Sequence, residues 1–146
     1  MRIDTTSDSP SWTKVFQITD ELHRLNEVLE KNYAFLDWEL SVCIRCLPKK
    51  LERKTFSRFY AKEKMLALDI ATDEEEFIPV KNDEAAQRKL IGAAFFAFFE
   101  ESITKYDKKL PDLAPVSAQL ISDVRQWCSE HGWTVDESYS QARREL

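Results

Sequence analysis

Two pairs of potential metal ligands are the most chemically versatile residues of this 146-residue chain. Cys43 and Cys46 form a C-x-x-C pair, and Cys128 with His131 forms a C-x-x-H pair. Together they match the four sulfur and nitrogen ligands of a structural zinc site. However, the residue pattern around the first pair predicts a strand, on which residues three apart point to opposite faces. Cysteines in such a setting usually serve as small buried hydrophobic residues, so we expect no metal and no other cofactor.

Other motifs of enzyme chemistry are absent from the sequence. It contains no serine nucleophile elbow, no phosphate-binding loop and no H-E-x-x-H motif. Of the two histidines, His23 lies on the charged side of a predicted helix and His131 near a predicted helix C-terminus, where a protonated ring is favourable. Adjacent acids such as Glu100 and Glu101 are typical of a solvated helix face. We therefore predict a protein that binds a partner and is not an enzyme.

Two opposite charge blocks follow each other in the middle of the chain. Residues 45–64 include eight basic side chains and two acidic ones, whereas residues 65–82 include five acidic ones and one basic. The basic block begins with Arg45, Lys49 and Lys50. The acidic block consists of Asp69, Asp73, Glu74, Glu75 and Glu76. Such a dipolar surface, with no catalytic motif beside it, indicates recognition of a partner.

The charge blocks allow more than one interpretation. The four consecutive acids at residues 73–76 are often a solvated turn. They are also suited to occupy a basic cleft that normally binds phosphates, with Asp69 extending the same patch. The basic hairpin at residues 45–64, with its aromatic side chains, could instead bind nucleic acid. The net charge of −5 argues against that alternative, because dedicated nucleic-acid binders are usually basic.

Hydrophobic periodicity places these residues on an α+β framework. Apolar residues recur at helical spacing from Val15 to Leu29, which predicts a helix that begins at Ser11. Alternating patterns predict strands at residues 36–46, 55–62 and 65–72, and a short fourth at 77–80. Two further helices are expected at residues 82–106 and 115–131, the last one ended by Gly132. We expect an N-terminal helix, an antiparallel sheet of three or four strands, and two C-terminal helices packed on the sheet.

Length and composition predict a single domain over residues 1–146, with flexible segments at 1–10 and 137–146. The first ten residues lack the apolar core of a secretory signal. The longest apolar run, Ile91–Phe99, is shorter than the roughly 20 residues of a membrane span. Because three cysteines cannot all pair within one chain, we also expect a reducing compartment. These features together predict a cytoplasmic protein that does not enter the membrane.

Three segments resemble a family of bacterial immunity proteins, which are encoded beside polymorphic or contact-dependent growth-inhibition toxins. The segments are LDWELSVCIRCLPKKL (36–51), FSRFYAKEKMLALDIATDEEEF (56–77) and QRKLIGAAFFAFFEESITKYDKK (87–109), within a similarity that covers about residues 12–135. The resemblance implies a small protein that binds a cognate toxin domain, often a nuclease, and silences it without catalysis. It transfers no fixed set of interface residues.

The toxin interface is therefore expected from charge alone. Asp69 and residues 73–76 would face a basic substrate cleft of the toxin. A toxin with an acidic face would instead engage Arg45, Lys49 and Lys50. The alternatives to an immunity protein are a nucleic-acid-binding module that uses residues 45–64 and an interaction scaffold stabilised by zinc at the two cysteine-containing pairs.

Overall fold

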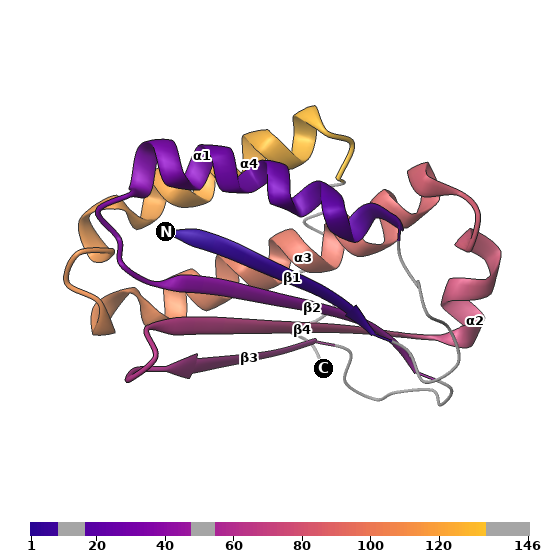
Figure 1. The fold of residues 1–146 in the computed structure, drawn as a ribbon, viewed down its shortest axis with the longest axis horizontal. Helices are drawn as coiled ribbons and strands as arrows, with labels where there is room; N and C mark the ends of the chain where they lie inside the picture. Colours follow the sequence, from indigo (N-terminus) through magenta and orange to yellow (C-terminus); the bar gives the residue numbers. More distant parts are fainter. Residues whose placement is uncertain (9–16, 48–54, 134–146) are drawn as a thin grey trace. The chain divides into compact units, whose positions relative to one another are not determined.

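The computed structural model describes residues 1–8, 17–47 and 55–133 of the chain. These residues belong to two compact units, Met1–Gln87 and the part from Arg88 on. The first unit contains a sheet and one long helix, and the second contains two helices joined by short turns (Figure 1). The α+β class expected from the sequence is confirmed, while the organisation as a single domain stays a prediction.

The first unit is built on a four-stranded mixed sheet. Its strands are β1 (Arg2–Asp8), β2 (Glu39–Leu47), β3 (Thr55–Tyr60) and β4 (Met65–Asp73). They lie in the order β1-β2-β4-β3, so that β2 and β4 are central (Figure 1). β1 and β4 both run parallel to β2, and β3 runs antiparallel to β4. The expectation of an antiparallel sheet is therefore wrong.

The pairing of β4 on both of its edges produces this difference. β4 pairs in parallel with β2 along one edge and antiparallel with β3 along the other. Leu66, Leu68 and Ile70 are buried on one side of β4, and Ala67, Asp69 and Ala71 alternate with them on the other. This alternation shows which face of the strand is buried, but it does not show which strand lies beside it.

β1 lies in a segment that was expected to be a loose arm. Its sequence, RIDTTSD, contains one strongly apolar residue, Ile3, so hydrophobic alternation does not reveal a strand. Its seven residues nevertheless pair in register with β2, from Arg2 opposite Glu39 to Asp8 opposite Arg45. The Ile3 amide also donates to Oδ1 of Asn26, 2.9 Å away on the neighbouring helix. Pairing and this side-chain hydrogen bond thus order a polar edge strand.

α1 (Leu22–Tyr33) follows a short 3-10 turn at Gln17–Glu21 and packs along β1 (Figure 1). Its inner face buries Leu22, Leu25, Leu29 and Tyr33, whose spacing of three and four residues is that of an α-helix. The predicted N-terminal helix is therefore confirmed over this range. Its expected beginning at Ser11 lies outside the described residues.

A short helix, α2 (Glu74–Phe77), and a 3-10 turn, η2 (Ile78–Val80), follow β4 directly. A short fourth strand was expected there, and that expectation is wrong. Glutamate favours helix over strand, and Pro79 fits the first turn of a helical segment because that position needs no amide donor. Phe77 is buried, with 1 % of its surface exposed, so the turn is fixed to the unit by an apolar side chain.

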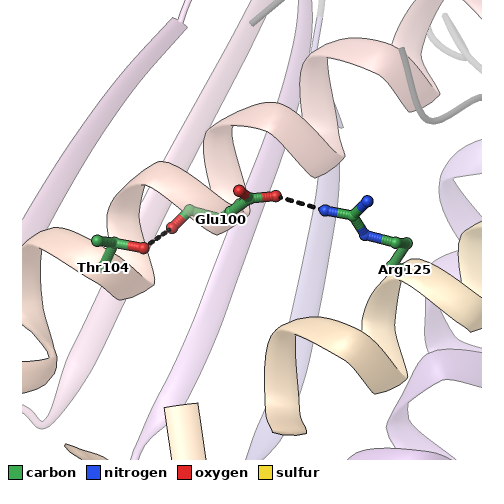
Figure 2. A network of polar contacts seen from close by, with 3 residues as sticks. All are labelled: Glu100, Thr104 and Arg125. Carbon is green, nitrogen blue, oxygen red and sulfur yellow. Dashed lines mark hydrogen bonds and ion pairs between the residues drawn. The ribbon is translucent and has the colours of Figure 1, made fainter. Parts of the chain in front are cut away.

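The second unit contains α3 (Glu84–Tyr106) from Arg88 on and the whole of α4 (Ser117–Glu130). Two 3-10 turns, at Asp107–Lys109 and Ala114–Val116, join the two helices. Every residue from Ile91 to Phe99 is buried, as its continuous apolar pattern predicts. Figure 2 shows one link between the two helices, an ion pair of Glu100 and Arg125. Within the described ranges, no helix combines the length and the apolar character needed to cross a membrane.

Gly132 ends α4 as the sequence predicts. Its φ of +75° is the left-handed conformation that residues with a Cβ rarely adopt. The turn brings the Trp133 amide back to the carbonyl oxygen of Cys128, at 2.8 Å. The Trp133 ring is then fully buried, 5.8 Å from the ring centre of Phe95 and 5.9 Å from that of Trp127. The turn at Gly132 thus places Trp133 in the aromatic core of this unit.

Candidate partner-binding site

The sheet has one buried face and one partly solvated face. The buried face carries Leu40, Val42 and Ile44 of β2 beside Leu66, Leu68 and Ile70 of β4. The side chains between them in sequence form the other face and are half-buried or exposed, apart from Ala71. The described members of this second face on the two central strands are Glu39, Ser41, Cys43, Arg45, Met65, Ala67, Asp69 and Ala71. Residues from both charge blocks therefore project from one surface.

Arg45 and Asp69 are close neighbours on this solvated face. In the pairing of β2 with β4, Cys43 lies opposite Asp69 and Arg45 lies opposite Ala71. Opposed residues of paired strands project to the same side, as do residues two apart on one strand. Arg45 is therefore a diagonal neighbour of Asp69. The sequence offered these two residues as members of alternative interfaces, and the structure places them on the same face of the sheet.

The Arg45 side chain is exposed and leans back along β2. Its Nε donates to Sγ of Cys43 at 3.2 Å, and Cys43 lies directly opposite Asp69 in the pairing of β2 with β4. The Arg45 backbone is also held, because Oγ1 of Thr72 donates to its carbonyl oxygen at 3.2 Å. A cation on the same face as Asp69 offsets part of the negative charge of this surface.

The remaining acids continue from the end of β4 into α2. Asp73 ends β4 opposite Leu47, and Glu74 begins α2; nothing is described of these two side chains. Glu75 is exposed and Glu76 is half-buried. The acidic block thus runs from the solvated sheet face onto a helical turn. Lys49 and Lys50, the other candidates from the basic block, lie outside the described residues.

An apolar residue that the sequence analysis missed lies beside these acids. The Ile78 side chain is 59 % exposed, and it is one of two large hydrophobic residues that are exposed in the described part of the chain. Protein interfaces typically combine an apolar centre with a polar rim. An isoleucine two residues after a run of acids and directly before Pro79 was a usable signal, but the sequence analysis assigned it to a short strand. We refer to Asp69, Asp73–Glu76 and Ile78 as the acidic patch.

The candidate zinc ligands find no support in the geometry. The described residues contain no group of three or more histidine, cysteine, aspartate or glutamate side chains that could hold a metal ion. Burial raises the pKa of the Cys128 thiol to about 12, which disfavours the thiolate that zinc requires. His131 has its Nδ1 2.8 Å from the Trp127 carbonyl oxygen and its ring stacked on the Trp127 indole, at 4.4 Å between centroids. Cys43 lies on β2 in the first unit, whereas Cys128 and His131 belong to the second unit.

Comparison with known proteins identifies one family. A family model described as Immunity protein 44 matches residues 1–130 of the chain. The matched range contains every strand and helix described above, to the end of α4. No curated protein and no solved structure matches the chain.

Proposed function

The chain belongs to the Immunity protein 44 family, and from this membership we propose that it binds a cognate nuclease toxin in the cytoplasm and neutralises it by covering the active site. Family membership confirms the resemblance to bacterial immunity proteins and with it an immunity role. The toxin would belong to a polymorphic or contact-dependent growth-inhibition system, as the resemblance implies.

The acidic patch is the observation that supports a nuclease as the target. A nuclease binds phosphates, so its substrate cleft is basic. Glu75 on α2 and Asp69 on the solvated sheet face present carboxylates that can take the place of those phosphates. Ile78 adds exposed apolar area, and burial of such area provides affinity that salt does not screen.

The proposed mechanism is stoichiometric occlusion. Opposite charges on the two surfaces accelerate encounter, which suits a protein that must intercept its toxin quickly. Once bound, the apolar contact at Ile78 and the desolvated carboxylates slow dissociation. One immunity protein then silences one toxin molecule, and toxin in excess of the immunity protein stays active. A catalytic inhibitor would instead inactivate many toxin molecules.

Binding and its location are tested with the protein encoded immediately upstream of this chain. The two proteins are co-expressed, the complex is purified, and its affinity is measured at several salt concentrations. A variant in which residues 73–76 are replaced by serine or asparagine removes four carboxylates from the patch. The matched control removes four carboxylates elsewhere, in Asp20→Asn, Glu27→Gln, Asp112→Asn and Glu130→Gln, all exposed positions.

We expect the patch variant to bind the toxin at least about tenfold more weakly than the control, with a shallower salt dependence and an unchanged melting temperature. Equal affinity of the two variants would exclude the acidic patch as the interface. A lack of any complex between the unmodified proteins would contradict the proposed function itself.

A further inference from the structure

A further candidate site lies at the end of the sheet opposite to α2, where the C-terminal end of α1, the segment that enters β2 and the turn between β3 and β4 come together (Figure 1). Residues of these segments line a pocket of about 420 Å³. All of its lining residues belong to the first unit. The pocket exceeds the volume of any single side chain, so it can receive a large one from a partner. Neither the sequence motifs nor the charge blocks indicated this site.

The pocket has an apolar base. Leu36 and Trp38, which line it, are 2 % and 7 % exposed. Phe35, which directly precedes Leu36 and is not itself a lining residue, is 55 % exposed and is the second of the two exposed large hydrophobic residues described. Like Ile78 at the other end of the sheet, Phe35 offers apolar area beside charged side chains. This combination again resembles the anchor region of an interface.

The charges around the opening are unevenly balanced. Nζ of Lys64 pairs with Oδ2 of Asp37 at 3.3 Å, so these two charges compensate each other. The other lining residues with charged side chains are three acids and one base: Glu30, Glu39, Glu63 and Lys62. The ammonium of Met1 also lies at the pocket and donates to the Tyr33 carbonyl oxygen, at 2.6 Å. The carboxylates therefore exceed the cations, and the opening favours a positively charged occupant.

We propose that this pocket receives an arginine side chain of the toxin, an inference that rests on the function proposed above. The methylene groups of arginine can lie on Leu36 and Trp38 while its guanidinium reaches the carboxylates at the opening. A planar guanidinium also stacks favourably on an aromatic ring, and the aromatic residue that lines this pocket is Trp38. The fixed fork of donors of the guanidinium makes paired hydrogen bonds with carboxylates, which the ammonium of lysine cannot reproduce.

The distance between the two sites fits a single partner. β4 begins at Met65 beside the pocket and ends at Asp73 in the acidic patch. Nine strand residues span about 27 Å at the usual rise of a β-strand. An interface of standard size covers about 800 Å² on each partner, which corresponds to roughly 30 Å across. One toxin domain can therefore contact both ends of the sheet.

Filling the pocket with an arginine from the immunity protein itself tests the proposal. Ala34 lines the pocket and is exposed, so Ala34→Arg places a cation at the opening without removing an existing side-chain contact. The matched control is Ala118→Arg, at an exposed position of α4. We expect Ala34→Arg to weaken binding of the upstream-encoded toxin at least about tenfold, and Ala118→Arg to change it less than about twofold.

A second variant keeps the proposal testable if Ala34→Arg does not fold. Glu30→Gln combined with Glu63→Gln removes two carboxylates from exposed positions and preserves side-chain size. Each exposed arginine of the toxin is replaced by alanine in turn, and the effects are combined in double-mutant cycles. One toxin arginine should lose most of its contribution to affinity when the two glutamines are present.

The outcomes separate this inference from the proposed function. Suppose that the wild-type protein binds the toxin. If Ala34→Arg then has no effect, or if no toxin arginine is coupled to Glu30 and Glu63, the proposal of an arginine in the pocket is wrong and the immunity role stands. A failure of the wild-type protein to bind the toxin would overturn both.

Discussion

Arg125 on α4 and Glu100 on α3 form an ion pair, with Nη2 of the arginine 3.1 Å from Oε2 of the glutamate (Figure 2). The same guanidinium lies 5.0 Å from the ring centre of Phe96, one turn before Glu100. Thr104, one turn after Glu100, donates to its carbonyl oxygen at 2.9 Å (Figure 2). A single arginine therefore joins the two helices through a carboxylate and an aromatic face.

Replacing Arg125 by alanine should lower the free energy of unfolding by about 1–2 kcal/mol. The ion pair contributes less than about 1 kcal/mol, because its side chains are 43 % and 38 % exposed and solvent screens them. The cation–π contact and the packing of the arginine stem supply the rest. Urea unfolding measures the difference, with Lys108→Ala as the control at an exposed position. An equal loss in both variants would show that Arg125 stabilises nothing beyond an ordinary surface residue.

Cys128 should make the protein sensitive to alkaline pH. Burial raises the pKa of its thiol from 9.0 to about 12 in the folded protein. Below pH 9 the thiol is protonated in both states, so it does not contribute to the pH dependence of stability. Above pH 9 the unfolded chain loses this proton and the folded chain retains it, so stability falls as pH rises by up to about 1.4 kcal/mol per unit.

Urea unfolding of the wild-type protein and of Cys128→Ala, followed from pH 8 to pH 11, isolates this effect. The variant should lack the Cys128 part of the decline, so the stability difference between the two proteins shifts in favour of the variant as pH rises. Other groups that ionise in this range are common to both proteins and cancel. A difference that stays constant with pH would show that the thiol ionises normally in the folded state.

The helices could be predicted from the sequence because their signals are local. The spacing of Leu22, Leu25 and Leu29 identifies α1, and the stop at Gly132 needs no long-range partner. The beginning of α3 was expected at Asn82, two residues before its first residue, Glu84. Oδ1 of Asp83 instead accepts from the Ala86 amide at 3.1 Å, so the cap is supplied by the neighbouring acid.

The order of the strands could not be predicted in this way. Alternation shows which face of a strand is apolar, but it does not show which strand lies beside it. β1 contains Ile3 among polar residues, and its order depends on pairing with β2 and on a hydrogen bond that the Ile3 amide donates to Asn26, both distant in sequence. The same limit applies to the site. The acidic run was visible in the sequence, whereas the proximity of Arg45 to Asp69 follows from the parallel register of β2 and β4.

Gln87 closes the turn that follows the acidic patch. Its side chain is fully buried, and Nε2 donates to the carbonyl oxygens of Val80 and Lys81 at 2.9 and 3.1 Å. Replacement by leucine leaves both carbonyls without this donor, while it also removes Oε1, which has no partner in the described structure. These opposing effects should give a net loss of about 1–2 kcal/mol in the free energy of unfolding.

Gln87→Glu should be more destabilising than Gln87→Leu at neutral pH, and the difference should depend on pH. A buried carboxylate facing two carbonyl oxygens is repelled, so the pKa of the introduced glutamate would be raised in the folded state. The protonated form donates a hydrogen bond and restores stability at low pH, and the loss grows as pH rises above about 4.3, the ordinary pKa of glutamate. Urea unfolding of the two variants at pH 4 and pH 7 tests this. Equal stability of both variants at pH 7 would show that the two carbonyl oxygens do not repel a carboxylate at this position.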